Sequence, residues 1–163
     1  SGWSYYDEEI QDALERSACM LQEICDYASS KGLQLAMETV WEGSTRLGCN
    51  LKNAQKIYSM VERKNFKLAL DLSAAAFAGE TIEQWMHCFG KDIIHCHFVD
   101  TTRTGKGHMP WGYGDGNLKK SLDTLNQYDF CGGLVLEYTQ AVAYAEPGKY
   151  LHEMAEAIRK ILL

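Results

Sequence analysis

Four apolar segments of the chain each end in side chains that could bind a metal ion or transfer a proton. The segments are residues 33–39 (LQLAMET), 66–72 (FKLALDL), 93–100 (IIHCHFVD) and 132–138 (GGLVLEY). The ionisable residues at their ends are Glu38, Asp71, His97 with Asp100, and Glu137. Carboxylate oxygens with one imidazole nitrogen suit Mn²⁺, Mg²⁺ or Co²⁺ and could also hold Zn²⁺. Three converging carboxylates would repel one another without a cation, so the sequence favours a divalent metal site. The alternative is that each group pairs locally with Lys, Arg or the backbone.

Two histidines lie one residue apart in the third segment, His95 and His97. Because side chains alternate along a strand, both would point to one face, and Ile94, Cys96 and Phe98 would point to the other. The pair therefore either packs in the core or reaches into a site.

Helical patterns separate the four segments. The expected helices cover residues 7–31, 51–62 with Asn50 as the cap, 82–89 after Thr81, a stretch from about Asn117, and a closing helix after Pro147. Apolar strands that alternate with helices predict parallel βαβ units, here a single α/β domain over residues 1–163. In such folds the carboxyl ends of the strands face the ligand, so the strand-end residues are expected to share one site.

Composition narrows the class of protein. The net charge of −6 and the lack of a long Lys/Arg cluster argue against nucleic acid as a partner. No apolar run approaches the length of a membrane span. Six cysteines without a CxxC pair are typical of reduced thiols in a cytoplasmic protein.

The spacing of Glu38, Asp71, His97 and Glu137 resembles the metal site of the xylose-isomerase-like TIM-barrel superfamily. Two further segments, HCHFVDT (95–101) and HMPWGYGD (108–115), are similar to that superfamily's histidine-pair and glycine-loop signature. The superfamily includes sugar phosphate isomerases and epimerases, inosose dehydratases and apurinic endonucleases. Within the superfamily, the sequence resembles the ketose 3-epimerase group, of the fructoselysine 3-epimerase type.

This resemblance implies the C-terminal half of a (β/α)8 barrel, with four parallel strands and their helices. A TIM barrel has eight strands and typically about 250 residues, so we expect the open half to be completed by association. The partner would be a second copy, giving a homodimer, or a separately made N-terminal half.

The resemblance also implies roles for individual residues. The metal ligands would be Glu38, Asp71, His97 and Glu137, and Mn²⁺ is favoured over Mg²⁺, Co²⁺ or Zn²⁺. Glu38 and Glu137 would also be the catalytic acid and base. Arg103 and His108 would contact the substrate, and Trp111 would form a wall of a sugar pocket. His95 would lie one step deeper, beneath the site.

The implied function is that of a metal-dependent isomerase or epimerase, which removes a proton next to the carbonyl of a ketose or sugar derivative and forms an enediolate. One alternative is a non-catalytic half-barrel that self-associates and still binds metal. Another is an inosose-type dehydratase, which would use the same groups for elimination. Ala74 stands where many members have a histidine three residues after the aspartate, which argues against the endonucleases.

Overall fold

The computed structural model of the chain describes residues 9–139 and 141–162, and it has the α/β fold expected from the sequence. Its four strands are β1 (Leu35–Glu38), β2 (Phe66–Asp71), β3 (Ile93–His97) and β4 (Gly133–Val135). All neighbouring strands are parallel, in the order β1-β2-β3-β4. The strands lie within the ranges predicted for them but are shorter, because the last residues of each predicted range extend beyond the paired ladder.

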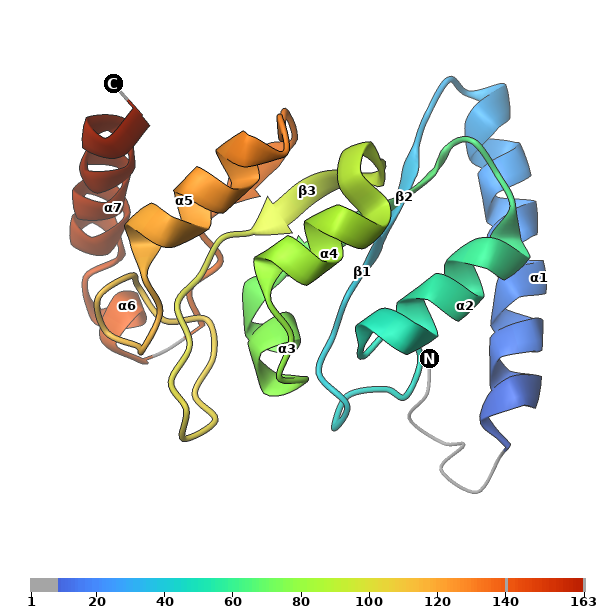
Figure 1. The fold of residues 1–163 in the computed structure, drawn as a ribbon, viewed down its shortest axis with the longest axis horizontal. Helices are drawn as coiled ribbons and strands as arrows, with labels where there is room; N and C mark the ends of the chain where they lie inside the picture. Colours follow the sequence, from blue (N-terminus) through green and yellow to red (C-terminus); the bar gives the residue numbers. More distant parts are fainter. Residues whose placement is uncertain (1–8, 140, 163) are drawn as a thin grey trace.

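Helices connect the strands and lie side by side along the sheet, with α1 at one end and α7 at the other (Figure 1). The longer helices are α1 (Ile10–Ser30), α2 (Leu51–Val61), α4 (Ile82–Phe89), α5 (Leu118–Gln127) and α7 (Pro147–Leu162). All five match patterns in the sequence, although residues 7 and 8 of the first predicted helix lie outside the described residues. The caps have the expected chemistry: the Asn50 side chain accepts a hydrogen bond from Asn53 N–H, and Thr81 forms a capping box with Gln84.

Three short elements were not expected from the sequence. These are α3 (Leu72–Phe77), α6 (Ala141–Ala145) and a 3₁₀ turn, η2 (Gly90–Asp92). Helix α3 follows β2 without a loop, because the Asp71 side chain caps it by accepting a hydrogen bond from Ala74 N–H at 2.8 Å. Six residues are too few to produce a helical period in the sequence.

The hydrophobic core lies between the sheet and the helices. Its largest fully buried apolar side chains are Trp85, Phe66, Phe98, Leu14, Ile57, Leu68, Leu70, Met86, Val61 and Val99. The helix-facing side chains of the strands are therefore packed in the core. The ionisable side chains at the carboxyl ends of the strands are not part of it. No helix among the described residues is long and apolar enough to cross a bilayer.

The register of the sheet determines which strand-end residues meet. Asp71 is paired with His97 across β2 and β3, and His97 is paired with Val135 across β3 and β4. Glu38 is paired with Ala69, two residues before Asp71. Glu137 lies two residues after Val135. Because side chains alternate with a period of two, these offsets place all four functional groups on the same face.

Candidate metal centre

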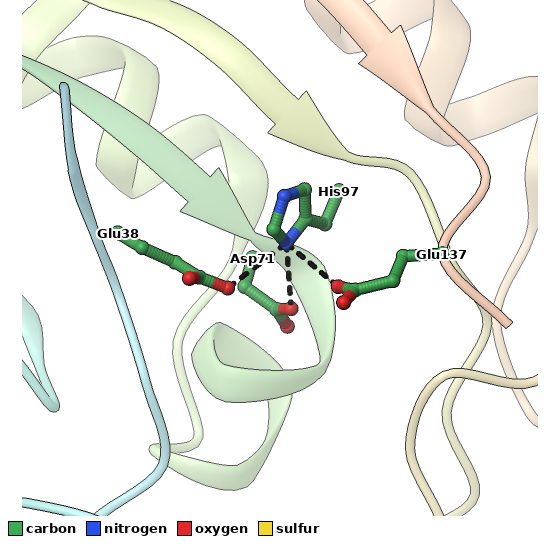
Figure 2. A group of neighbouring side chains, drawn as sticks. All are labelled: Glu38, Asp71, His97 and Glu137. Carbon is green, nitrogen blue, oxygen red and sulfur yellow. Dashed lines mark ion pairs between the residues drawn. The ribbon is translucent and has the colours of Figure 1, made fainter. Parts of the chain in front are cut away.

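Four side chains converge at the carboxyl ends of the four strands, as Figure 2 shows. His97 Nδ1 lies 3.0 Å from Glu38 Oε1, 3.0 Å from Glu137 Oε2 and 3.4 Å from Asp71 Oδ2. One donor atom from each of the four residues lies within 4.8 Å of the others. One nitrogen and three oxygen ligand atoms therefore lie close enough together to surround one ion.

The orientation of these atoms fits a metal ion better than a hydrogen-bond network. His97 Nδ1 and Glu137 Oε2 are both buried, yet neither has a hydrogen-bond partner despite their 3.0 Å separation. The imidazole nitrogen and the carboxylate oxygen are therefore not directed at each other but toward a common position between the side chains. Adjacent ligands of an octahedral ion with bonds of about 2.1 Å are separated by about 3.0 Å. The four residues therefore have the chemistry and the spacing to hold a divalent cation.

Asp71 is the most tightly held member of the group, with a side chain that is only 4% exposed. Its Oδ1 accepts the capping hydrogen bond from Ala74 N–H, and its Oδ2 faces His97. Its backbone N–H donates to the hydroxyl of Thr39 at 2.8 Å, and Thr39 is itself buried. One carboxylate oxygen is thereby committed to the fold, and the other is left for the site.

Glu38 and Glu137 approach His97 from opposite sides (Figure 2). Their side chains are 45% and 44% exposed, in contrast to Asp71. A cavity of about 290 Å³ opens beside Glu38 and Asp71, and α3 and the loop after β3 also line it. The two glutamates are therefore the more exposed carboxylates of the group.

His108 lies against the four residues without belonging to their cluster. Its Nε2 lies 3.3 Å from Asp71 Oδ2, and its Nδ1 lies 3.1 Å from the backbone oxygen of Glu137. The backbone N–H of His108 donates to the buried Ser73 hydroxyl at 2.9 Å, with φ at 54°. A non-glycine residue in this left-handed region is uncommon, and here three contacts hold it in place.

His95, the other member of the histidine pair, packs beside the His97 ring. The two ring centroids are 5.3 Å apart and the rings meet edge to face. A Cβ atom at Gly133 would lie 3.2 Å from the His95 ring, so this glycine gives the ring its room. His95 therefore supports the orientation of His97.

A model of the family described as xylose isomerase-like TIM barrel matches residues 1–161. The chain belongs to this family. Among curated proteins, it is 24% identical over 160 residues to an uncharacterized protein of Methanocaldococcus jannaschii, covering 97% of this chain and 54% of that one. It is 22% identical over 147 residues to fructoselysine 3-epimerase of Escherichia coli O157:H7, covering 90% of this chain and 53% of that one.

Solved structures show the same fold. A D-tagatose 3-epimerase-like protein superposes with a TM-score of 0.75 at 20% identity, over 99% of this chain and 60% of that chain. A D-allulose 3-epimerase from Methylomonas sp. gives a TM-score of 0.61 at 19% identity, over 77% of this chain and 42% of that chain. The chain spans about half the length of the curated relatives it matches. Its described residues form four of the eight strands of a TIM barrel, so the chain is a half-barrel of this family.

Two residues predicted from the sequence to contact the substrate do not line the cavity beside the metal centre of this xylose isomerase-like half-barrel. Arg103 is exposed and lines a second cavity, of about 480 Å³, between α3, α4 and α5. Trp111 is 8% exposed, its Nε1 donates to the Phe98 backbone oxygen at 3.1 Å, and it packs on the Phe98 ring. Substrate contact by these two residues stays a prediction. Trp41, in contrast, lines the cavity beside Glu38 and is 55% exposed.

Two buried hydroxyl groups support the centre and were not singled out in the sequence. Thr39 holds the backbone of Asp71, and Ser73 holds the backbone of His108. Each lies one or two residues after a strand-end acid, and this position beside a predicted ligand is the only signal that the sequence offers. Asp100, which the sequence placed among the strand-end acids, does not join the four ligand residues and lies beneath the loop that follows β3.

Proposed function

We propose that this half-barrel carries the metal-binding and proton-transferring part of an isomerase or epimerase that acts on a ketose or a sugar derivative. The observation that supports this most directly is the placement of Glu38 and Glu137 on opposite sides of His97, each with a side chain that is nearly half exposed. The names of the relatives point the same way, because the fructoselysine, D-tagatose and D-allulose proteins are 3-epimerases or similar to one.

Epimerisation requires that a proton leave one face of a carbon next to a carbonyl and that another return on the opposite face. The C–H bond is weakly acidic, so a positioned base must take the proton as the enediolate forms. In our proposal one of the two glutamates removes it, and the other, from the far side, donates a proton to the same carbon. The pair can exchange these roles, which makes the reaction reversible.

The residues that would hold the divalent metal are Glu38, Asp71, His97 and Glu137, with Mn²⁺ favoured by the oxygen-rich set. When bound, such an ion would offset two of the three carboxylate charges and stabilise negative charge that develops on the substrate oxygens. His97 is oriented for this by His95, and Asp71 by Ala74 and Thr39. The exposed Trp41 indole would provide a flat apolar surface for the sugar.

We also propose that the open sheet is paired in the functional protein, with a second copy of the chain or with a separate N-terminal half. Within the described residues, β1 and β4 are paired on one side only. Exposed apolar side chains lie at both ends of the helix row, with Met20, Ile24 and Tyr27 on α1 and Leu151 on α7. Such edges and patches favour association. Analytical ultracentrifugation should show a dimer at micromolar concentration, and a monomer would contradict self-association.

The first test is the metal content of the purified chain and its melting temperature before and after chelation. We expect near-stoichiometric Mn, Co or Zn and a melting temperature that falls on chelation, because an ion that binds only the folded state stabilises it. Glu137→Gln should lose both effects. Glu156→Gln on α7, whose side chain is 43% exposed, is the matched control and should keep them. A wild-type chain with no bound metal and no response to chelation would favour the non-catalytic half-barrel.

A further inference from the structure

The loop that follows β3, residues 101–116, forms one wall of the cavity beside the metal centre. Gly105, Gly107 and His108 line that cavity. The loop contains no helix or extended strand, and its regular pairing is a single antiparallel bridge between Asp100 and Met109. Something other than secondary structure must therefore fix its shape.

The carboxylate of Asp100 lies at the centre of this loop and is 1% exposed. Its Oδ1 accepts hydrogen bonds at 2.8 Å from the backbone N–H groups of Thr101 and Gly116. Its Oδ2 accepts from Gly112 N–H at 3.0 Å and from Gly114 N–H at 2.9 Å. Four backbone donors from both ends of the loop thus bind one side chain. Hydrogen bonds to an ionised acceptor are stronger than neutral ones, so this is the main anchor of the loop.

The fit around Asp100 is specific for a carboxylate of this length. A Cβ atom at Gly114 or Gly116 would lie 2.5 Å from Asp100 Oδ1, so the loop backbone approaches as closely as glycine allows. Glutamate has no room for its extra methylene. Asparagine would turn an NH₂ group toward N–H donors that need an acceptor.

The anchor is coupled to the metal centre through the backbone next to His108. Asp100 and Met109 exchange two backbone hydrogen bonds, of 2.9 and 3.0 Å, and His108 directly precedes Met109. The buried Ser73 hydroxyl accepts from both His108 N–H and the Thr101 hydroxyl, at 2.9 Å each. A displacement of the loop at Asp100 would therefore move the His108 imidazole away from its contacts at the centre.

We infer that Asp100 is a positioning residue: its carboxylate fixes the loop as a wall of the substrate cavity and holds His108 against the metal-ligand residues. The role of the cavity as a substrate site rests on the proposed function. The role of Asp100 in fixing the loop does not depend on the proposed function, so each of the two hypotheses can be refuted separately.

The test compares Asp100→Asn with wild type by two measurements that need neither metal nor activity. Trypsin can cut the loop after Arg103 and Lys106, and diethyl pyrocarbonate modifies accessible imidazoles. We expect cleavage at these two bonds under native conditions to become about tenfold faster or more, because the loop opens locally when its N–H groups lose their acceptor. Labelling of His108 should rise in parallel, measured against the exposed His87 as an internal reference.

The matched control is Asp123→Asn, which removes an exposed carboxylate on α5 and should leave both rates unchanged. If Asp100→Asn does not fold, Gly116→Ala disturbs the same contact from the loop side and is measured in the same way. Rates for the folded variant equal to those of wild type would overturn the inference, as would loop cleavage without a change at His108. A wild-type chain that binds none of Mn, Co or Zn would count against the proposed function instead, and the loop measurements would still decide the role of Asp100.

Discussion

The hydroxyl of Thr39 accepts a hydrogen bond from the backbone N–H of Asp71, with 2.8 Å between oxygen and nitrogen. This contact joins the residue after one proposed ligand, Glu38, to the backbone of another. Thr39 is 1% exposed, so no water can replace its hydroxyl. The ends of β1 and β2 are therefore held in register at the point where their carboxylates meet.

Replacing Thr39 by valine should destabilise the chain, because the buried Asp71 N–H would lose its acceptor while the side-chain volume is kept. The expected loss is about 1–3 kcal/mol in the free energy of unfolding. Urea denaturation followed by circular dichroism measures it. Thr39→Ser keeps the hydroxyl and should recover most of the loss. Equal stabilities for the valine and serine variants would show that the bond contributes little.

Removing the charge of either glutamate should suppress proton exchange at the substrate. In a preparation in which the barrel is completed, Glu38→Gln and Glu137→Gln should each slow deuterium uptake from solvent next to the ketose carbonyl, by about 10²- to 10⁴-fold. Mass spectrometry of the recovered sugar gives the rate. Epimer formation with normal uptake in either variant would contradict the two-base proposal. Loss of water from the product would indicate the dehydratase alternative.

Trp111 offers a test between packing and substrate contact. Trp111→Phe removes the hydrogen bond to the Phe98 backbone oxygen and part of a buried ring. We expect a loss of about 1–3 kcal/mol in the free energy of unfolding and an unchanged KM for the sugar. Denaturation and steady-state kinetics on the same variant separate the two effects. A raised KM at normal stability would support the substrate contact predicted from the sequence.

The cysteines should divide into two reactivity classes in the folded chain. Burial raises the pKa of the Cys96 thiol, and the nearby Asp71 carboxylate adds to the rise. Burial also raises the pKa values of Cys25 and Cys49. A raised pKa leaves less of the reactive thiolate at pH 8.

A disulfide reagent at pH 8 should therefore react quickly with three thiols and with all six only after denaturation. The three exposed residues are Cys19, Cys88 and Cys131. The absorbance of the thiolate released from the reagent gives the number of cysteines that have reacted. Six fast thiols in the native chain would mean that the core around β3 opens readily.

The fold class was predictable because it depends on local periodicity. The apolar strand segments and the intervening helical patterns show βαβ units without any long-range information. Helix α3 was not predictable in this way. Its six residues are too few to show a helical period, and the helix begins where the Asp71 side chain caps it. The loop at 101–116 was equally hidden, because its shape depends on a carboxylate buried beneath it.

The sequence by itself determined that Glu38, Asp71, His97 and Glu137 would lie together. Each stands at the carboxyl end of a strand, and parallel strands bring those ends to one edge of the sheet. The alternation of side chains along the third strand also placed His95 on the same face as His97.

Only the tertiary structure decided what the remaining candidates contact. Asp100 carries a carboxylate close to a strand end, as three of the proposed ligands do, yet it binds four loop N–H groups. Trp111 turns into the core, while His108 reaches Asp71 and Glu137. The physical reason is that a strand's period fixes the direction of its side chains, whereas loop side chains are directed by contacts with residues far away in the sequence.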